Sequence, residues 1–280
     1  MSERKIDLSI IIVHYKAKKE LFDCLSSIRK SKPSFSYEII VVDNDEDETV
    51  KPELAKKFIE ARYIKSLGNI GFGAGNNLGA SKAHGEFLFF LNPDTIVKHG
   101  AIDTLVEFLQ KNPGVGIVAP LLINKDGTPC HIQVTTELTP VEGMVAHSFI
   151  NKYFPENAIS RRYFLHSWDK KGTKEVGVIQ GAAFVIRRKI FEELHGFDER
   201  FFLYFEETDL CRRMRKLGYK IYMYPKAKVI HLEGRSVRDN AQNKKIFAQS
   251  RFQYFEKHFG ILPAMLVQFV TGVRKPSYKI

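Results

Sequence analysis

The chain has 280 residues, 44% of them hydrophobic, and a formal net charge of +11 at pH 7. This composition excludes a fibrous or disordered protein and suffices for one large hydrophobic core or two modest ones. The excess of lysine and arginine favours an anionic partner such as a nucleic acid, a phosphorylated substrate or an acidic lipid surface.

The first 123 residues alternate between buried strand patterns and segments whose apolar residues recur at helical spacing. Strands are predicted at 7–15, 37–42, 61–66, 87–91 and 115–123, and helices at 19–30, 52–60 and 101–110, with a small-residue helix that ends near 85. This alternation is typical of a Rossmann-like, mostly parallel α/β sheet with right-handed crossovers and helices on both faces.

The rest of the chain is less regular. Residues from about 124 to 175 lose periodicity, and we expect an irregular insertion or flap there. Order returns with a strand pair or bent strand at 176–187, helices at 188–194 and from 206, and short strands at 220–224 and 227–231. We therefore expect one domain over 1–238, followed by a basic, aromatic helical tail over 239–280.

The apolar run from Phe87 to Leu91 ends abruptly in Asn92-Pro93-Asp94. Because Pro93 cannot continue a strand ladder, Asp94 is predicted at the carboxyl end of a central strand, where open α/β sheets bind ligands. A carboxylate there can hold a hard cation against phosphate oxygens. The alternative is that these residues only form a turn before the next helix.

The glycine-rich segment 68–79 follows the third predicted strand. Gly71 and Gly73 fit the start of a dinucleotide-binding fingerprint, but Asn76 stands where its third glycine belongs. A more general role is also open, because glycines let backbone amides approach a ligand while Asn69 and Asn76 supply hydrogen bonds. A tight loop that packs beside a helix is the structural alternative.

Short motifs spread over most of the chain carry a family resemblance. They read SIIIVHY (9–15), VVDN (41–44), NIGFGAGNN (69–77), LNPDT (91–95), QGA (180–182), GFDERFF (196–202), EETDLCR (206–212) and HLEGRS (231–236). In this order they resemble the nucleotide-sugar glycosyltransferases of family 2, which have the GT-A fold. The similarity is greatest to the bacterial rhamnosyltransferase-type enzymes that build surface polysaccharide.

The resemblance implies a role for many of these residues. Asp43 would bind the nucleotide base or ribose, and Asp94 would end an Asp-x-Asp metal motif in which Asn92 replaces the first aspartate. His231 would add an imidazole ligand to Mn²⁺ or Mg²⁺, although it could instead simply end a strand beside Glu233. The other implied donor-binding residues are His14, Tyr15, Asn44, Asn69, Gly71, Phe72, Asn76, Gly181 and Ala182.

The resemblance also implies a catalytic base. Glu207 aligns with the base of the family's Glu-Asp motif, but it is Glu where Asp is usual, so Glu206 and Asp209 are alternatives. The expected reaction is an inverting single displacement, in which a carboxylate takes the acceptor's proton and a cation offsets charge on the leaving phosphate. The three acids could also serve only to favour the positive end of a helix dipole.

The sequence of the tail predicts a contact with a membrane surface. Aromatic residues recur there among lysines and arginines, and the apolar part after Pro263 is too short to span a bilayer. Such an end suits an anionic membrane interface, with packing on the catalytic domain or a dimer contact as the alternative. The aromatic and basic residues concerned are Phe247, Tyr254, Phe255, Phe259, Lys244, Lys245, Arg251, Lys257, Arg274, Lys275 and Lys279.

The sequence also predicts where the protein works. Residues 1–5 lead straight into a strand pattern without the apolar region of a signal peptide. The three cysteines, Cys24, Cys130 and Cys211, form no disulfide or zinc pattern. We therefore expect a cytoplasmic protein, peripheral on the inner face of the cell membrane.

The leading hypothesis is a metal-dependent transferase that moves a sugar from a nucleotide-sugar, with dTDP-rhamnose as first candidate, to a glycan or lipid-linked saccharide. It requires no nucleic-acid partner. A sugar-1-phosphate nucleotidylyltransferase is one alternative, but its glycine-rich loop belongs after the first strand, where residues 14–18 read His-Tyr-Lys-Ala-Lys. A non-enzymatic basic protein that binds nucleic acid or acts as a scaffold is the other.

Overall fold

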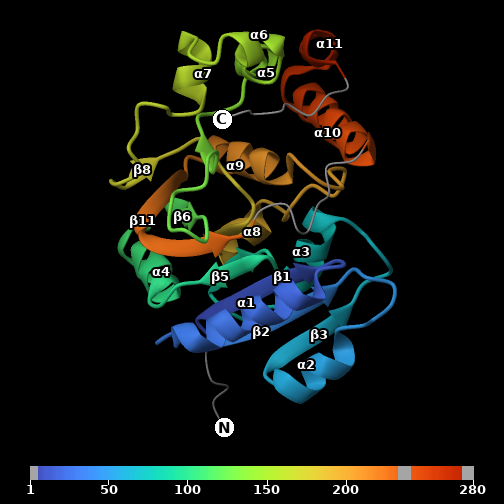
Figure 1. Cartoon of the computed structure of the whole chain (residues 1–280), viewed down its shortest axis with the longest axis vertical. Coiled ribbons are helices and arrows are strands. Elements are labelled where there is room, and N and C mark those ends of the chain that lie inside the picture. The colour runs from blue at the N-terminus through green and yellow to red at the C-terminus, as the bar shows by residue number, and fades with distance from the viewer. Residues whose placement is uncertain (1–5, 233–240, 273–280) are drawn as a thin grey trace.

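The computed structural model describes residues 6–232 and 241–272 of the chain. A nine-stranded sheet runs through the molecule in the order β3-β2-β1-β4-β10-β6-β11-β5, with β8 paired to β11 beside this path (Figure 1). The strands are β1 Leu8–His14, β2 Tyr37–Asp43, β3 Ala61–Lys65, β4 Phe87–Leu91, β5 Thr95–Val97, β6 Val115–Ile123, β8 Lys174–Glu175, β10 Ala183–Arg187 and β11 Lys220–His231. The predicted mostly parallel sheet is therefore present.

The parallel part of the sheet follows from its sequence. Every residue of β1, β4 and β6 is buried, as expected for continuous apolar runs covered on both faces. Strands β3, β2, β1 and β4 pair in parallel, and β6 pairs in parallel with β11. Strand β10 lies antiparallel between β4 and β6, so the sheet is mixed. The inserted strand runs opposite to its two neighbours, but its hydrophobic pattern is like theirs.

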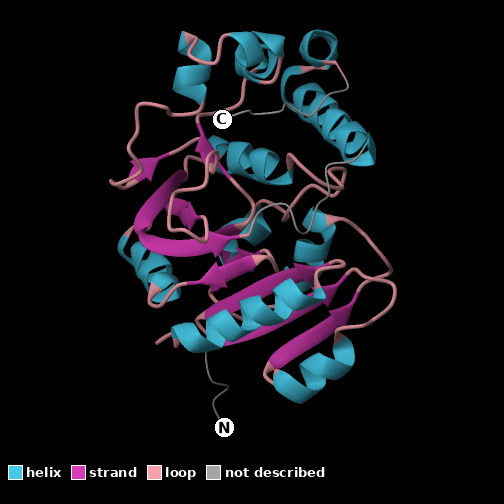
Figure 2. Ribbon diagram, in the orientation of Figure 1, coloured by secondary structure: helices cyan, strands magenta, loops and turns pink. Residues whose placement is uncertain are grey.

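Helices cover both faces of the sheet, as Figure 2 shows. The main ones are α1 Lys18–Ser31, α2 Lys51–Lys57, α3 Phe72–Ala80, α4 Ala101–Lys111, α8 Arg188–Glu193 and α9 Glu206–Lys216. Leu25 of α1 and Leu105 of α4 belong to the core on one face. Phe191 of α8 and Met214 of α9 belong to the core on the other face. The predicted two-faced α/β arrangement is thus what the chain forms.

The segment between β6 and β10 has more structure than its sequence predicts. It contains the two-stranded pairing of β7 Val134–Thr135 with β9 Val178–Ile179, and the short helices α5 Pro140–Ala146, α6 Phe149–Tyr153 and α7 Ala158–Tyr163. These helices are only one or two turns long, which is too short for a clear helical period to appear in the sequence.

The tail forms α10 Ala241–Phe259 and α11 Ile261–Thr271, which pack against the insertion. Tyr254 and Phe255 are fully buried, and the Tyr254 hydroxyl donates a hydrogen bond to the Leu138 carbonyl at 3.0 Å. Packing, rather than membrane contact, therefore accounts for these tail aromatics. Arg274, Lys275 and Lys279 lie outside the described residues.

Strand β11 is one long element where two short strands are predicted. Its pairing with β6 shifts register between Tyr224 and Lys228, which face the adjacent residues Pro120 and Leu121. The intervening residues 225–227 form a bulge that begins with Pro225, which has no amide hydrogen for the ladder. Beyond the bulge, β11 also pairs with β5 and sets His231 opposite Thr95.

Candidate active site

The predicted site residues gather at the edge where β1, β2 and β4 end. His14 and Asp43 are the last residues of β1 and β2 and face each other in the parallel register. Asn92 follows β4 directly, and its amide donates a 2.8 Å hydrogen bond to the Ala182 carbonyl before β10. Segments from four parts of the chain therefore meet at the carboxyl edge of the sheet, the usual ligand edge of this architecture.

Asp43 is buried and tightly held. It accepts hydrogen bonds from His14 Nδ1 at 2.9 Å, from the Tyr63 hydroxyl at 2.9 Å and from the Asp45 amide at 3.1 Å. The Ala17 amide donates to His14 Nε2, which leaves the hydrogen of this imidazole on Nδ1. Burial opposes ionisation of Asp43, but these donors lower the pKa of its carboxyl below the ordinary value. The carboxylate is therefore ionised and fixed in direction.

The glycine-rich segment is held from two sides. Asn44 Nδ2 donates to the Gly71 carbonyl at 2.9 Å, and the Phe72 amide donates to the Phe202 carbonyl at 3.0 Å. Asn69 Oδ1 accepts from the Gly71 amide at 3.2 Å. These bonds fix the path of residues 69–72 between β2 and the segment before α9.

Replacing Gly71 by alanine is expected to destabilise the fold more than the same change at Gly68. Both glycines have φ near +90°, but a Cβ at Gly71 would overlap the Phe202 carbonyl oxygen, whereas a Cβ at Gly68 has no neighbour within 4 Å. Backbone strain costs about 1–3 kcal/mol in each case, and the overlap adds at least about 1 kcal/mol at Gly71. Urea unfolding measures the difference, and equal losses would contradict the close approach.

Helix α9 starts from a strained turn. Tyr204 and Phe205 have φ values of 70° and 69°, a conformation that residues other than glycine rarely adopt. The Phe205 ring packs against Phe247 and Tyr254 of α10, with centroid distances of 5.2 and 5.7 Å. The tail helix therefore stabilises the turn that presents Glu206 and Glu207 to the site.

The two glutamates lie in an apolar setting. Burial, together with the charge of Glu207, raises the pKa of Glu206 well above its ordinary value, and burial raises the pKa of Glu207 to about 7. Glu206 is buried, whereas Glu207 as a whole remains partly exposed. Since burial raises its pKa into the neutral range, Glu207 has a property required of a general base that works near neutral pH.

Glu207 also faces the other motifs. A Cβ placed on Gly181 would lie 3.8 Å from the Glu207 carboxyl carbon and 3.5 Å from the Phe72 ring. A Cβ placed on Gly73 would lie 3.6 Å from Glu206 Cβ. The glycines at 73 and 181 thus permit close packing against Glu206 and Glu207, and they bring the glycine-rich segment, the 180–182 motif and the start of α9 together.

Several of the predicted motifs carry buried acceptor oxygens. Within the described residues, side-chain oxygens that are buried and lack a hydrogen-bond partner include Asn44 Oδ1, Asn92 Oδ1, Gln180 Oε1, Glu206 Oε2 and Glu207 Oε2. Nearly all buried polar atoms in native proteins are paired, so these unpaired oxygens require an explanation. Sugar hydroxyls or a cation bound here would satisfy these acceptors.

The predicted metal ligands are adjacent. His231 Nε2 lies 3.5 Å from Asp94 Oδ1, both side chains are buried, and the Leu232 amide donates to the Asp94 carbonyl at 2.9 Å. Ligands about 2.1 Å from a shared cation are separated by about 3–4 Å when they occupy neighbouring positions, so this pair fits one ion. No group of three or more His, Cys, Asp and Glu side chains suited to a metal occurs in residues 6–232 and 241–272. Substrate oxygens would supply further ligands to such an ion. Glu233, Gly234 and Ser236 lie outside the described residues.

The structure does not support Asp209 as a base. Its carboxylate accepts hydrogen bonds from Arg213 Nε at 2.7 Å, Lys257 Nζ at 2.5 Å and His258 Nε2 at 2.7 Å. Burial opposes ionisation, but these partners lower the pKa of Asp209 to about 2. Asp209 therefore joins α9 to the tail helix α10, and such a carboxylate accepts a proton poorly near neutral pH.

Other predicted residues shape the site or lie beside it. Asn76 Nδ2 donates to the Phe72 carbonyl at 3.0 Å, which commits it to the first turn of α3. Tyr15 is partly exposed after β1, where a ligand at this edge can reach it. Sequence reasoning missed Tyr63, and it gave no role to Gln180, although Gln180 is the first residue of the QGA motif.

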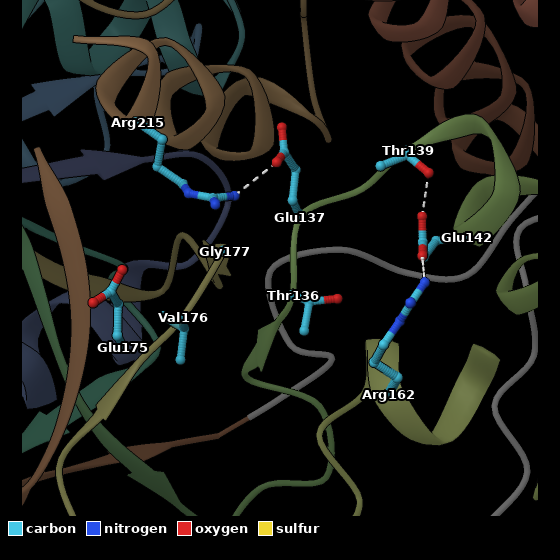
Figure 3. Close-up of a pocket in the computed structure, with 9 residues that line it drawn as sticks. All are labelled: Thr136, Glu137, Thr139, Glu142, Arg162, Glu175, Val176, Gly177 and Arg215. Atoms are coloured by element: carbon cyan, nitrogen blue, oxygen red, sulfur yellow. Dashed lines mark hydrogen bonds and ion pairs between the residues drawn. The ribbon is translucent and has the colours of Figure 1, made fainter. Parts of the chain in front are cut away.

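A pocket of about 400 Å³ lies away from these residues. Figure 3 shows it between the insertion and α9, where Glu137 pairs with Arg215 at 2.9 Å and Glu142 pairs with Arg162. Arg215 stands two turns after Glu207 along α9. The polar groups of this pocket are already matched in ion pairs, and none of the predicted site residues lines it.

Comparison with known proteins identifies the family. The family model described as Glycosyl transferase family 2 matches residues 9–195. The O-antigen biosynthesis protein RfbC of Myxococcus xanthus is 29% identical over 235 residues, which cover 82% of this chain but only 18% of that protein. The N-acetylglucosaminyl-diphospho-decaprenol L-rhamnosyltransferase of Mycobacterium tuberculosis (strain CDC 1551 / Oshkosh) is 25% identical over 237 residues, or 79% of this chain and 76% of that protein.

A solved structure supports the same assignment at the level of the fold. The crystal structure of GalNAc-T7 with UDP, GalNAc and Mn²⁺ has a TM-score of 0.63 and 18% identity, and the match covers 91% of this chain and 51% of that one. This similarity confirms the predicted GT-A type of α/β fold, and the family match replaces the nucleotidylyltransferase and non-enzymatic alternatives. Since the matched region is more than half of the chain, the protein belongs to glycosyl transferase family 2.

Proposed function

We propose that this glycosyltransferase moves a sugar from a nucleotide-sugar, with dTDP-rhamnose as first candidate, to a saccharide acceptor in bacterial surface polysaccharide synthesis. The names of the M. tuberculosis and M. xanthus relatives support the sugar and the pathway class. The observation that carries the proposal is the convergence of Glu207, Phe72 and Asn92 on residues 181–182, together with the unpaired buried acceptors of these motifs.

Glu207 is the proposed base. A sugar hydroxyl that attacks the anomeric carbon must lose its proton, and a carboxylate with a pKa of about 7 can accept it near neutral pH. Direct attack by the acceptor inverts the anomeric carbon without a covalent intermediate. The neighbouring Glu206 also has a raised pKa, because burial and the charge of Glu207 disfavour its ionised form.

Asp94 and His231 would hold a divalent cation, Mn²⁺ or Mg²⁺, which when bound offsets the negative charge of the leaving diphosphate. The similar structure of GalNAc-T7 contains UDP and Mn²⁺, which supports this proposal. Asn92 carries no charge, so binding of the cation would depend strongly on the diphosphate oxygens of the donor.

The nucleotide would lie along the ends of β1 and β2. Asp43 keeps lone pairs beyond its three protein donors and would accept from the base or ribose, while the partly exposed Tyr15 follows His14 at the end of β1. His14 and Asn44 act through the positions of Asp43 and Gly71. The acceptor is proposed to be a glycan or lipid-linked saccharide, and a lipid-linked acceptor would bring the enzyme to the inner face of the cell membrane.

A panel of nucleotide-sugars tests this function. UDP-, GDP- and dTDP-sugars are added with Mn²⁺ or Mg²⁺, and the thermal midpoint is measured, since a ligand that binds only the folded state raises stability by about 2.7 kcal/mol at 100 times its Kd. We expect dTDP-rhamnose to give the largest metal-dependent rise. A panel without any metal-dependent stabilisation would refute the proposed metal-dependent binding of the donor, and a larger rise with another donor would replace dTDP-rhamnose.

A further inference from the structure

We propose that α6 and α11 together form a docking surface for an anionic lipid bilayer. This inference rests on the proposed lipid-linked acceptor for its biological purpose, but the contact itself can be measured without any sugar transfer. The surface, called here the α6–α11 surface, consists of Val141, Phe149, Tyr153, Phe154, Ile261, Leu262, Met265, Leu266 and Phe269.

Helix α11 is apolar on both sides. Ala264 and Val267 are buried against the rest of the protein, whereas the large side chains recur at 261, 262, 265, 266 and 269 and are exposed. This spacing puts the exposed side chains on one face of the helix. Phe269 is 88% exposed, and burying a side chain of this size contributes about 1.5–3 kcal/mol. An exposed apolar stripe of this extent indicates a binding surface.

The insertion extends this stripe. Helix α5 contacts both α11 and α6, and α6 with its next residue exposes Phe149, Tyr153 and Phe154, the last of them 69% accessible. In Figure 1 these helices form the end of the molecule opposite α2. Two segments more than a hundred residues apart in the chain thus contribute to one apolar end, in which the aromatic side chains come mainly from the insertion.

Charge favours an anionic bilayer over a second copy of the chain. Neither α6 nor α11 contains an aspartate or glutamate, and α6 contributes Lys152. The chain carries a net charge of +11, so two copies repel each other while an anionic surface attracts each of them. Among the helices in the described part of the chain, none is both long and apolar enough to cross a bilayer. An exposed apolar face without acidic side chains, on helices that cannot span a bilayer, is compatible with interfacial binding.

Vesicle co-sedimentation with paired variants tests the surface. The full chain is mixed with phosphatidylglycerol-containing vesicles and with pure phosphatidylcholine vesicles, and the bound fraction is measured. We expect binding to the anionic vesicles that weakens with salt. Two double variants, Leu266→Asp with Phe269→Asp and Phe149→Asp with Phe154→Asp, should each raise the apparent Kd at least about tenfold.

Ile59→Asp is the matched control. Ile59 is 88% exposed but follows α2, at the opposite end of the molecule, so this variant should bind vesicles like the wild type. Each variant is checked by its thermal midpoint and by its stabilisation with donor and Mn²⁺. A loss of vesicle binding with donor stabilisation intact supports the surface, whatever the donor proves to be.

Two results would overturn the proposal. Wild-type chain that stays in the supernatant with anionic vesicles, or double variants that bind like Ile59→Asp, would show that the α6–α11 surface does not contact lipid. Concentration-dependent dimers in sedimentation velocity that the same double variants abolish, without vesicle binding, would assign the surface to a second copy. Failure of the donor panel, by contrast, would leave a positive vesicle result standing.

Discussion

Replacing Glu207 by glutamine is expected to lower kcat by roughly 10²–10⁴-fold, the range that a positioned general base contributes. Glutamine keeps the size of the side chain beside Gly181 and Phe72 but cannot accept the acceptor's proton. Donor binding should persist, because Glu207 acts on the acceptor hydroxyl. The measurement is the rate of nucleoside diphosphate release in the presence of acceptor, together with the donor Kd.

Glu206→Gln is the matched control. Glutamine resembles the protonated form that the raised pKa of Glu206 favours, so this variant should keep activity within a fewfold of wild type. Near-complete loss in Glu206→Gln with activity retained in Glu207→Gln would exchange the two roles.

The dependence of kcat/KM on pH tests the role of Glu207 separately. The base must be ionised, and burial raises the pKa of Glu207 to about 7. We therefore expect kcat/KM to fall about tenfold per pH unit below pH 7 and to level off above it. A value of kcat/KM that stays constant down to about pH 5 would contradict Glu207 as the base.

Replacing Asp94 by asparagine is the second large-effect prediction. The change keeps the shape of the side chain but removes the charge beside His231, with which a divalent cation would be held. The cation supplies several kcal/mol of charge stabilisation, so the rate should fall about 100-fold or more. In the thermal assay, the metal-dependent part of donor stabilisation should disappear.

The control for this variant is Asp23→Asn, which removes a surface carboxylate of α1 that pairs with Lys19. It should keep both metal dependence and rate, because exposed ion pairs contribute little. An Asp94→Asn protein that is stabilised by donor and Mn²⁺ as well as Asp23→Asn would rule out Asp94 as a metal ligand.

The buried strands could be predicted because their signal is local. Continuous apolar runs at 87–91 and 115–123 identify β4 and β6 from a few residues each. The antiparallel direction of β10 left no such signal, because a strand buried on both faces has the same composition in either direction. The short helices of the insertion also went unpredicted, since α6 spans only Phe149–Tyr153.

The candidate site could likewise be predicted from the sequence only in part. The ordered motifs indicated the segments that meet at the sheet edge, but the role of each acid depends on its partners in space. Asp209 and Glu207 stand two residues apart in the chain. Lys257 and His258 of α10 bind the Asp209 carboxylate, so Asp209 is a poor candidate for the base. Those contacts cross about fifty positions of the chain and follow no period, so only the folded structure reveals them.

The bulge in β11 has a consequence for the proposed metal site, because it precedes His231 in the strand. Residues 225–227 insert an odd number of residues, three, between Tyr224 and Lys228. Side chains on a strand alternate between its two faces with every residue. Losing one of the three without absorption of the change within the bulge would reverse the parity of everything downstream and turn the imidazole at 231 to the opposite side of the sheet. The proposed metal site would then be lost by a one-codon deletion that alters neither Asp94 nor His231.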